Sequence, residues 1–226
     1  MIVLKFGFLI FESRKKFLLI LAVAAFYTGL SLAYSLVGFL YFQPGSHYHE
    51  YLFGKLAIEI GGHYLFGFLA ALPLLDLDLA LLTGALAVLI DIDHLFSALG
   101  YNVSGRPDHS ILFLIVSTAF ILYVAVRMGV SSKLLTKLAF VPAITLFAHL
   151  SYDVFAQSGS TFQLFIPFSY EEVLVPDYSW IIFEAAAILT ALFALFLSSR
   201  KREHAKTSTR QAGHELPSSP RATGNI

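Results

Sequence analysis

Histidine and aspartate recur in this chain at spacings that suit metal ligation. Asp91-Ile92-Asp93-His94 places two carboxylates beside an imidazole, and His149 precedes Asp153 by one helical turn. Imidazole nitrogen and carboxylate oxygen are ligands of zinc and manganese, and the chain has no cysteine to offer instead. A bound divalent ion lowers the pKa of a water ligand, so that the water can attack a phosphoryl or acyl centre. The pattern therefore predicts metal-dependent hydrolytic chemistry.

The composition indicates that membrane helices position these residues. Of the 226 residues 57% are hydrophobic and 13% are charged, whereas a soluble domain has about 25% charged residues. Residues 17–42 contain no charged residue or histidine and are long enough to cross a bilayer core of about 30 Å. The apolar region of a cleaved signal peptide spans only about 7–15 residues, which favours an uncleaved first helix.

The hydropathy pattern predicts an all-α, multi-pass transmembrane bundle. Asp76 and Asp78 would be costly at mid-membrane, so we expect a tight turn there between two helices. The basic clusters at 14–16, 127–137 and 200–202 fall on one side, which the positive-inside rule makes cytoplasmic, as are both termini. The six expected helices cover residues 17–42, 57–75, 77–95, 111–126, 138–152 and 180–197.

We expect four segments along the chain. Residues 1–56 form an N-terminal segment with the first helix and an outer loop, and residues 57–178 form the membrane core that carries the metal site. Residues 179–199 form the sixth helix. Residues 200–226 are rich in Ser, Thr, Pro and Gly and are expected to be a disordered, basic cytoplasmic tail. The formal net charge of zero gives no support for a nucleic-acid partner.

The topology places the candidate ligands at one depth. His63 and Asp91 are equally far from Leu77 along two antiparallel helices, so both lie near the outer surface. His109 begins the fourth helix, where Ser110 is a candidate N-cap, and His149 ends the fifth. This convergence favours a metal site, with either one ion and supporting residues around its ligands or two ions.

Each motif also has a plain structural interpretation. Asp91 to His94 can be a polar helix end, and His149 with Asp153 can be a local hydrogen-bonded pair. His63 can belong to a solvated stripe with Lys55 and Glu59. His47 and His49 are interpreted as loop features, and Glu184 as a partner for a histidine or the start of a proton path.

The order of these motifs resembles a known family, the LexA-regulated, membrane-bound metal-dependent hydrolases of the YdjM type. The matching elements are His63-x-x-x-Gly67, Asp91-Ile92-Asp93-His94, Arg106-Pro107-Asp108-His109-Ser110, His149-x-x-x-Asp153, Gly159 and Pro167-Phe168-Ser169. The family's third motif usually reads His-Arg-x-x-Thr-His-Ser; here the leading His is missing and Asp108 replaces the Thr.

The resemblance implies a multi-pass protein of the prokaryotic inner membrane with metal-dependent hydrolase activity. We expect a divalent metal, zinc or alternatively manganese, and assign catalytic acid/base roles to Asp93 and Asp108. The metal ligands that the resemblance implies are His63, Asp91, Asp93, His94, His109, His149 and Asp153.

The expected depth of the site suggests its substrate class. A site at the outer interface meets membrane lipid, so a lipid or lipid-linked phosphoester is the expected substrate, and residues 157–170 are either a lid or an ordinary interfacial loop. The alternative is a cation or proton transporter or channel that uses the same cluster as its outer entrance. Such a protein needs a polar path, for which Asp76, Asp78 and Glu184 are the candidates. A structural membrane protein without turnover is the third hypothesis.

Overall fold

The structure is a computed structural model that describes residues 2–40, 53–92, 94 and 106–214, and their side chains over 14–36, 57–92, 94 and 106–200. The predictions for His47, His49 and Asp93 therefore lie outside the described residues, as do residues 215–226 of the expected tail.

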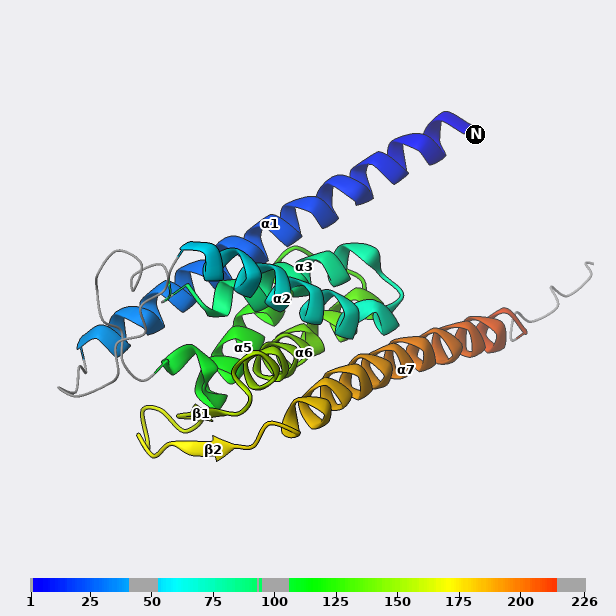
Figure 1. Cartoon of the computed structure of the whole chain (residues 1–226). Helices are drawn as coiled ribbons and strands as arrows, with labels where there is room; N and C mark the ends of the chain where they lie inside the picture. Colours follow the sequence, from blue (N-terminus) through cyan, green and yellow to red (C-terminus); the bar gives the residue numbers. More distant parts are fainter. Residues whose placement is uncertain (1, 41–52, 93, 95–105, 215–226) are drawn as a thin grey trace, which may run out of the picture.

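The described residues form six α-helices, which confirms the predicted all-α bundle (Figure 1). Two single 3₁₀ turns, η1 (Leu72–Leu74) and η2 (Pro107–His109), and two short strands, β1 (Ser160–Phe162) and β2 (Val173–Val175), complete the described elements. The helices are α1 (Ile2–Leu40), α2 (Phe53–Ala71), α3 (Leu77–Ile90), α5 (Ile111–Arg127), α6 (Ser132–Gln157) and α7 (Ser179–His214).

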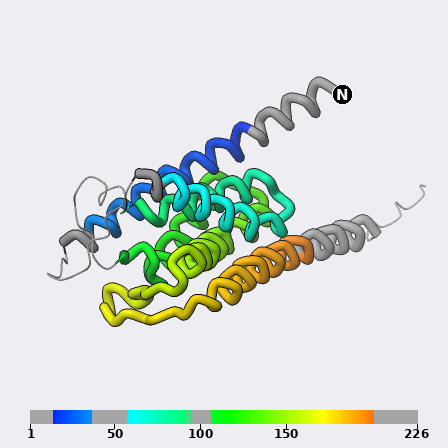
Figure 2. Tube along the Cα trace, viewed as in Figure 1, coloured from blue at the N-terminus to red at the C-terminus, as the bar shows by residue number. Residues whose placement is uncertain are grey.

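Four helical stretches are long and apolar enough to cross a membrane: Arg14–Leu36, Ala57–Leu74, Ser132–Gln157 and Ser179–Arg200. The apolar helices α3 and α5 are shorter. In α6, 67% of the residues of the most apolar 18-residue stretch are buried inside the protein, whereas in the other three helical stretches 22–28% are buried. Helix α6 packs against α2, α3, α5 and α7 and is therefore the centre of the bundle. Helices α1 and α7 flank the others (Figure 2).

A tight turn joins α2 to α3, as the sequence predicts. Leu75 adopts the left-handed conformation with φ 51°, and the side chain of Asp76 accepts a hydrogen bond from the backbone N–H of Leu79, which caps α3. Lys16 Nζ of α1 lies 2.7 Å from Asp76 Oδ1 and 2.6 Å from Asp78 Oδ2. The basic start of the first span and this turn therefore lie at the same end of the bundle.

Two glycines allow α2 and α3 to approach closely. A Cβ atom on Gly84 would lie 2.8 Å from the carbonyl oxygen of Tyr64, and one on Gly67 would lie 2.9 Å from Cβ of Ala87. Small residues at helix contacts let backbones meet at short range in membrane proteins. This approach brings the two ends of the hairpin that carry His63 and Asp91 within reach of each other.

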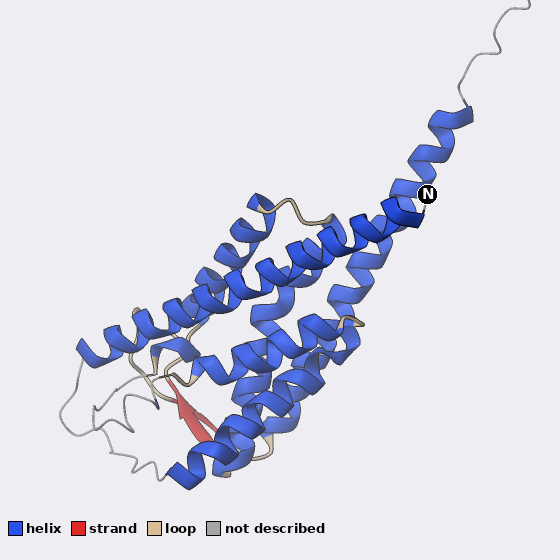
Figure 3. Ribbon diagram, turned by 90° about the horizontal axis from the view of Figure 1, so that it is seen from above, coloured by secondary structure: helices blue, strands red, loops and turns tan. Residues whose placement is uncertain are grey.

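Three features differ from the sequence predictions. Helix α1 begins at Ile2, ahead of residue 17, and α7 continues to His214, beyond its predicted end at residue 197, while the disordered tail stays a prediction. Residues 200–212 contain neither Gly nor Pro and are rich in good helix formers, which explains the continuation. The loop between α6 and α7 contains an antiparallel strand pair in which Thr161 faces Leu174, and Figure 3 shows this pair at one end of the bundle.

Candidate metal centre

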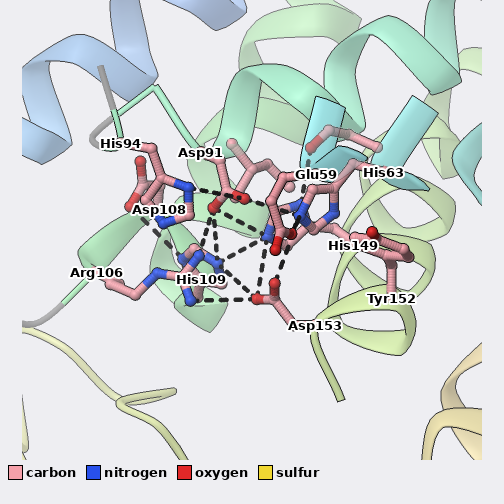
Figure 4. A network of polar contacts seen from close by, with 12 residues as sticks. Glu59, His63, Asp91, His94, Arg106, Asp108, His109, His149, Tyr152 and Asp153 are labelled. Atoms are coloured by element: carbon pink, nitrogen blue, oxygen red, sulfur yellow. Dashed lines mark hydrogen bonds and ion pairs between the residues drawn. The ribbon is translucent and has the colours of Figure 1, made fainter. Parts of the chain in front are cut away.

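Side chains from three helices and one 3₁₀ turn converge on one point (Figure 4). His63 comes from α2, Asp91 from the C-cap of α3, His109 from η2, and His149 and Asp153 from α6. Ligand atoms of four of them, His63, Asp91, His149 and Asp153, all lie within 4.8 Å of one another. The five side chains are almost entirely buried, with Asp91 the most exposed at 7%.

The α2–α3 hairpin sets the first pair. His63 Nε2 lies 2.8 Å from Asp91 Oδ2, which confirms that the two residues share one depth. Neither ring nitrogen of His63 has a hydrogen-bond partner among the described residues, so this short contact does not have the geometry of a hydrogen bond. His63 is 1% exposed, so the interpretation of a solvated stripe through this residue is wrong.

The orientation of His149 is fixed by the backbone of α3. Its Nδ1 lies 2.8 Å from the carbonyl oxygen of Ala87. A carbonyl only accepts hydrogen bonds, so Nδ1 carries the proton and Nε2 of the neutral ring presents its lone pair to the centre. Nε2 of His149 lies 2.8 Å from Nε2 of His109, within hydrogen-bond distance, so the two nitrogens face each other at the centre.

Asp108 stands behind His109. Its Oδ2 accepts hydrogen bonds from Ser31 at 2.9 Å and Ser35 at 3.3 Å, both in α1, and its Oδ1 lies 3.7 Å from Nδ1 of His109. Asp108 Oδ1 and His109 Nδ1 face each other, and neither atom has a hydrogen-bond partner among the residues that the structure describes. A carboxylate behind a ligand histidine fixes the ring and its tautomer, so Asp108 directs Nε2 of His109 to the centre.

The loop before α5 places the ring of His109. Ser110 caps α5 by accepting a hydrogen bond from the N–H of Phe113 at 3.2 Å, as the sequence predicts. Phe162 of β1 stacks over His109, with ring centroids 6.0 Å apart. His109 is fully buried, which alone would lower its pKa, and Arg106 acts in the same direction; the carboxylates of Asp108 and Asp153 outweigh both and raise the pKa.

Arg106 joins the two carboxylates. One guanidinium nitrogen donates to Asp153 Oδ2 at 3.3 Å and the other donates to Asp91 Oδ1. In the sequence, Arg106 stands out only as part of the third motif. Its contacts give it a role in the centre, because a cation is needed here to balance buried carboxylates.

Sequence reasoning missed two more residues beside His63. Glu59 Oε2 lies 3.8 Å from His63 Nε2, and the side chain of Glu59 is only 19% exposed. Tyr152 packs its ring edge on His63 and donates from its hydroxyl to the carbonyl oxygen of Ile58 at 3.2 Å. The one signal for Glu59 was its position four residues before His63, which also fits an exposed stripe.

The remaining predicted residues lie around this centre or apart from it. His94 is at the edge, with Nδ1 3.6 Å from Asp91 Oδ2, and is 8% exposed. Glu184 lies in α7 near Ser151, whose hydroxyl donates to the carbonyl oxygen of Trp180, and Glu184 Oε2 has no partner in the described part of the chain. None of the ion pairs between described residues joins Glu184 to a histidine.

The donor set fits a divalent metal ion. His63 Nε2, Asp91 Oδ2 and Asp153 Oδ1 are buried and lack hydrogen-bond partners among the described residues. Buried polar atoms are rarely left without a partner, since each costs about 1–3 kcal/mol. A cation held between these atoms would satisfy all three.

Comparison with known proteins agrees with the motif order. The model of the YdjM inner membrane protein family matches residues 58–212, which is more than half of the chain and includes every described residue of the centre except those contributed by α1. No curated protein and no solved structure matched the chain. The protein therefore belongs to the YdjM inner membrane protein family.

Proposed function

We propose that the protein is a metal-dependent hydrolase whose centre lies at the outer membrane–water interface. The observation that carries this proposal is the convergence of three imidazoles and two carboxylates from separate elements, with three of their donor atoms buried and without hydrogen-bond partners among the described residues. Helices and packed turns hold these side chains, so they are preorganised for a cation.

The centre is suited to zinc and, as a second choice, to manganese. His63, His109, His149, Asp91 and Asp153 supply the nitrogen and oxygen donors that these ions take, with His94 beside them. A divalent ion held there supplies Lewis acidity and lowers the pKa of a water molecule. The chain's own residues orient the donors: the carbonyl of Ala87 holds His149, and Asp108 holds His109.

Asp93 and Asp108 are the proposed acid/base residues. Asp108 is completely buried and faces Nδ1 of His109, so it exchanges protons with the centre only through that ring. Asp93 follows Asp91 by two residues in the chain and is the carboxylate proposed to act on water directly. Glu59, 3.8 Å from His63 Nε2, offers a third carboxylate.

The proposed substrate is a lipid or lipid-linked phosphoester. The centre lies about 20 Å from the α2–α3 turn, as the rise from His63 predicts, and Lys16 binds that turn. With the basic end cytoplasmic, the centre lies in the outer half of a bilayer core of about 30 Å, on the side of the outer headgroups. Phe168 and Leu174 in the α6–α7 loop are 84% and 75% exposed, which suits contact with lipid. Arg106 supplies a cation for a phosphoryl oxygen.

Transport of a cation or proton remains the alternative proposal, and Glu184 is the observation in its favour. Its carboxylate lies in a spanning helix and has an oxygen without a partner in the described part of the chain. However, buried residues between the centre and the α2–α3 turn are mostly apolar, including Leu79, Leu86, Leu138 and Ile144. The hydroxyls of Thr83 and Thr145 interrupt this apolar stretch, but no ion pair between described residues links the centre to Glu184 or to the α2–α3 turn, and we therefore propose hydrolysis first.

A hydrolysis assay in detergent tests the proposal. The purified protein should release phosphate from lipid phosphoesters when zinc or manganese is supplied, and a chelator should abolish the release. His149→Ala and Asp93→Asn should remove activity, while Ser117→Ala should keep it, because among the described residues the Ser117 hydroxyl bonds the Leu114 carbonyl within its own helix. Metal uptake into vesicles without phosphate release would favour the transporter instead.

A further inference from the structure

The donor atoms of the centre separate into two sets. The first set consists of one oxygen from each aspartate and the facing nitrogens of two histidines. Asp91 Oδ1 lies 3.5 Å from His109 Nε2 and 3.4 Å from His149 Nε2. Asp153 Oδ2 lies 3.4 Å from His109 Nε2 and 3.5 Å from His149 Nε2.

The second set uses the other oxygen of each aspartate. His63 Nε2 lies 2.8 Å from Asp91 Oδ2 and 3.5 Å from Asp153 Oδ1. Glu59 Oε2 approaches the same nitrogen at 3.8 Å, and His94 Nδ1 lies 3.6 Å from Asp91 Oδ2. Figure 4 shows Glu59 and His63 on one side of the centre and His109 on the other.

We propose that the centre holds two divalent cations, with the carboxylates of Asp91 and Asp153 each bridging them. His109 and His149 belong to one cation, and His63, with Glu59 or His94, belongs to the other. This inference rests on the proposed metal dependence and adds the number of ions and the role of each ligand.

The four oxygen–nitrogen distances in the first set match one tetrahedral ion, and the two histidine nitrogens, 2.8 Å apart, would separate by about half an ångström to hold it. Zinc lies about 2.0–2.2 Å from nitrogen and oxygen ligands, which separates the ligand atoms of a tetrahedral site by about 3.3–3.5 Å. All four oxygen–nitrogen separations of the first set are 3.4 or 3.5 Å. The first set thus supplies four ligands to one ion. His63 Nε2, Asp91 Oδ2 and Asp153 Oδ1 do not belong to that set.

The left-over atoms need a partner of their own. His63 Nε2, Asp91 Oδ2 and Asp153 Oδ1 are the atoms of the second set, and all three are buried without hydrogen-bond partners in the part of the chain that the structure describes. The first set differs, since Arg106 donates to Asp91 Oδ1 and Asp153 Oδ2 and leaves each oxygen a second lone pair for an ion. Arg106 thereby holds the two bridging carboxylates at a fixed spacing.

The charges of the centre also favour two cations. While the histidines are neutral, the guanidinium of Arg106 is the single positive charge among the described contacts. It balances one of the four negative charges carried by Glu59, Asp91, Asp108 and Asp153. Three negative charges then remain in a buried site, which is unfavourable. One divalent ion leaves the centre negative, whereas two leave it with a single positive charge, which suits an anionic substrate. Paired ions in such sites lie about 3.5–4 Å apart.

Metal titration of the full-length protein in detergent tests the proposal without any variant. Elemental analysis after removal of excess manganese should find two ions per chain. Electron paramagnetic resonance of that sample should show the spectrum of a spin-coupled pair, because carboxylate bridges couple the two ions. Saturation at one ion per chain, or two ions with the spectrum of isolated manganese, would overturn the proposal.

Variants separate the two positions. His109→Ala and His63→Ala should each reduce the stoichiometry from two ions to one and remove the coupling, while Asp153→Asn should remove it by breaking a bridge. Ser117→Ala is the control and should keep two coupled ions. Size-exclusion chromatography identifies variants that fail to fold, and then the wild-type titration alone decides.

The outcomes also distinguish this inference from the proposed function. One bound ion with metal-dependent phosphate release would overturn the paired centre and keep the hydrolase. Two coupled ions without phosphate release from lipid phosphoesters would keep the paired centre and count against the hydrolase. A protein that binds neither zinc nor manganese would overturn both.

Discussion

The hydroxyl of Ser31 donates to Oδ2 of Asp108 at 2.9 Å across 77 residues of sequence, and both side chains are completely buried. Ser31 lies in α1, whereas the family match begins at residue 58. The first helix therefore contributes to the centre by holding the carboxylate that orients His109.

Removing the support from α1 should weaken metal binding. In the double variant Ser31→Ala with Ser35→Ala, Asp108 loses both hydroxyl donors and His109 loses its fixed orientation. Loss of such a supporting interaction lowers metal affinity by about 10–100-fold. Competition with a zinc indicator measures the change. Thr28→Ala in the same helix is the control, because that hydroxyl bonds only the Ala24 carbonyl; an equal loss there would contradict the assigned role.

The close approach of α2 and α3 should be sensitive to one added methyl group. In Gly84→Ala the new Cβ would lie 2.8 Å from the carbonyl oxygen of Tyr64, which belongs to the backbone and cannot turn away. We expect a loss of about 1–3 kcal/mol in stability and weaker metal binding, because the hairpin positions His63 and Asp91. Thermal unfolding in detergent measures the first effect. Gly61→Ala, with no atom within 4 Å of its Cβ, should be neutral or stabilising.

The two ends of the bundle should be labelled from opposite sides of the membrane. The chain has no cysteine, so single-cysteine variants report sidedness directly. Glu171→Cys, in the exposed loop between the strands, should react with a membrane-impermeant maleimide in intact cells. Lys133→Cys, at the exposed start of α6, should react only after the inner membrane is opened. The reverse pattern would place the centre on the cytoplasmic side.

Metal-free and metal-loaded protein should respond to pH in opposite directions. The pKa of His109 is raised in the folded protein, so its charged form contributes stability that is complete below pH about 6.5 and is lost as the pH rises through the folded value. A metal ion must displace that proton, so the increase in melting temperature on adding zinc should grow over the same range. In His109→Gln, both the pH dependence of stability without metal and the pH dependence of stabilisation by zinc should become smaller. If neither changes, another group causes them.

The sequence predicted the helices and the depth of the centre for simple physical reasons. Apolar runs of membrane length leave few alternatives, and the equal distances of His63 and Asp91 from Leu77 follow from a constant rise per residue. The turn with Asp76 followed from the cost of carboxylates in the membrane core, and the cap at Ser110 from its position before an apolar run.

What the sequence could not give depends on contacts distant along the chain or on side-chain rotation. Nothing local connects Ser31 to Asp108, and the position of Arg106 depends on how the chain enters η2. Glu59 looked exposed, because helical spacing alone does not tell which neighbour covers a face. In both Asp91 and Asp153, one carboxylate oxygen faces His109 and His149 and the other faces His63. This arrangement is visible only in atomic positions.

Metal content tests the central claim most directly. Full-length protein, treated with a chelator, dialysed and exposed to zinc or manganese, should retain a divalent ion through gel filtration, as measured by elemental analysis. Asp153→Asn should retain less metal than the wild type, because it lacks one carboxylate ligand, and Ser117→Ala should retain as much. Wild-type protein that is folded and retains neither ion, or an Asp153→Asn variant that binds as much metal as the wild type, would contradict the account.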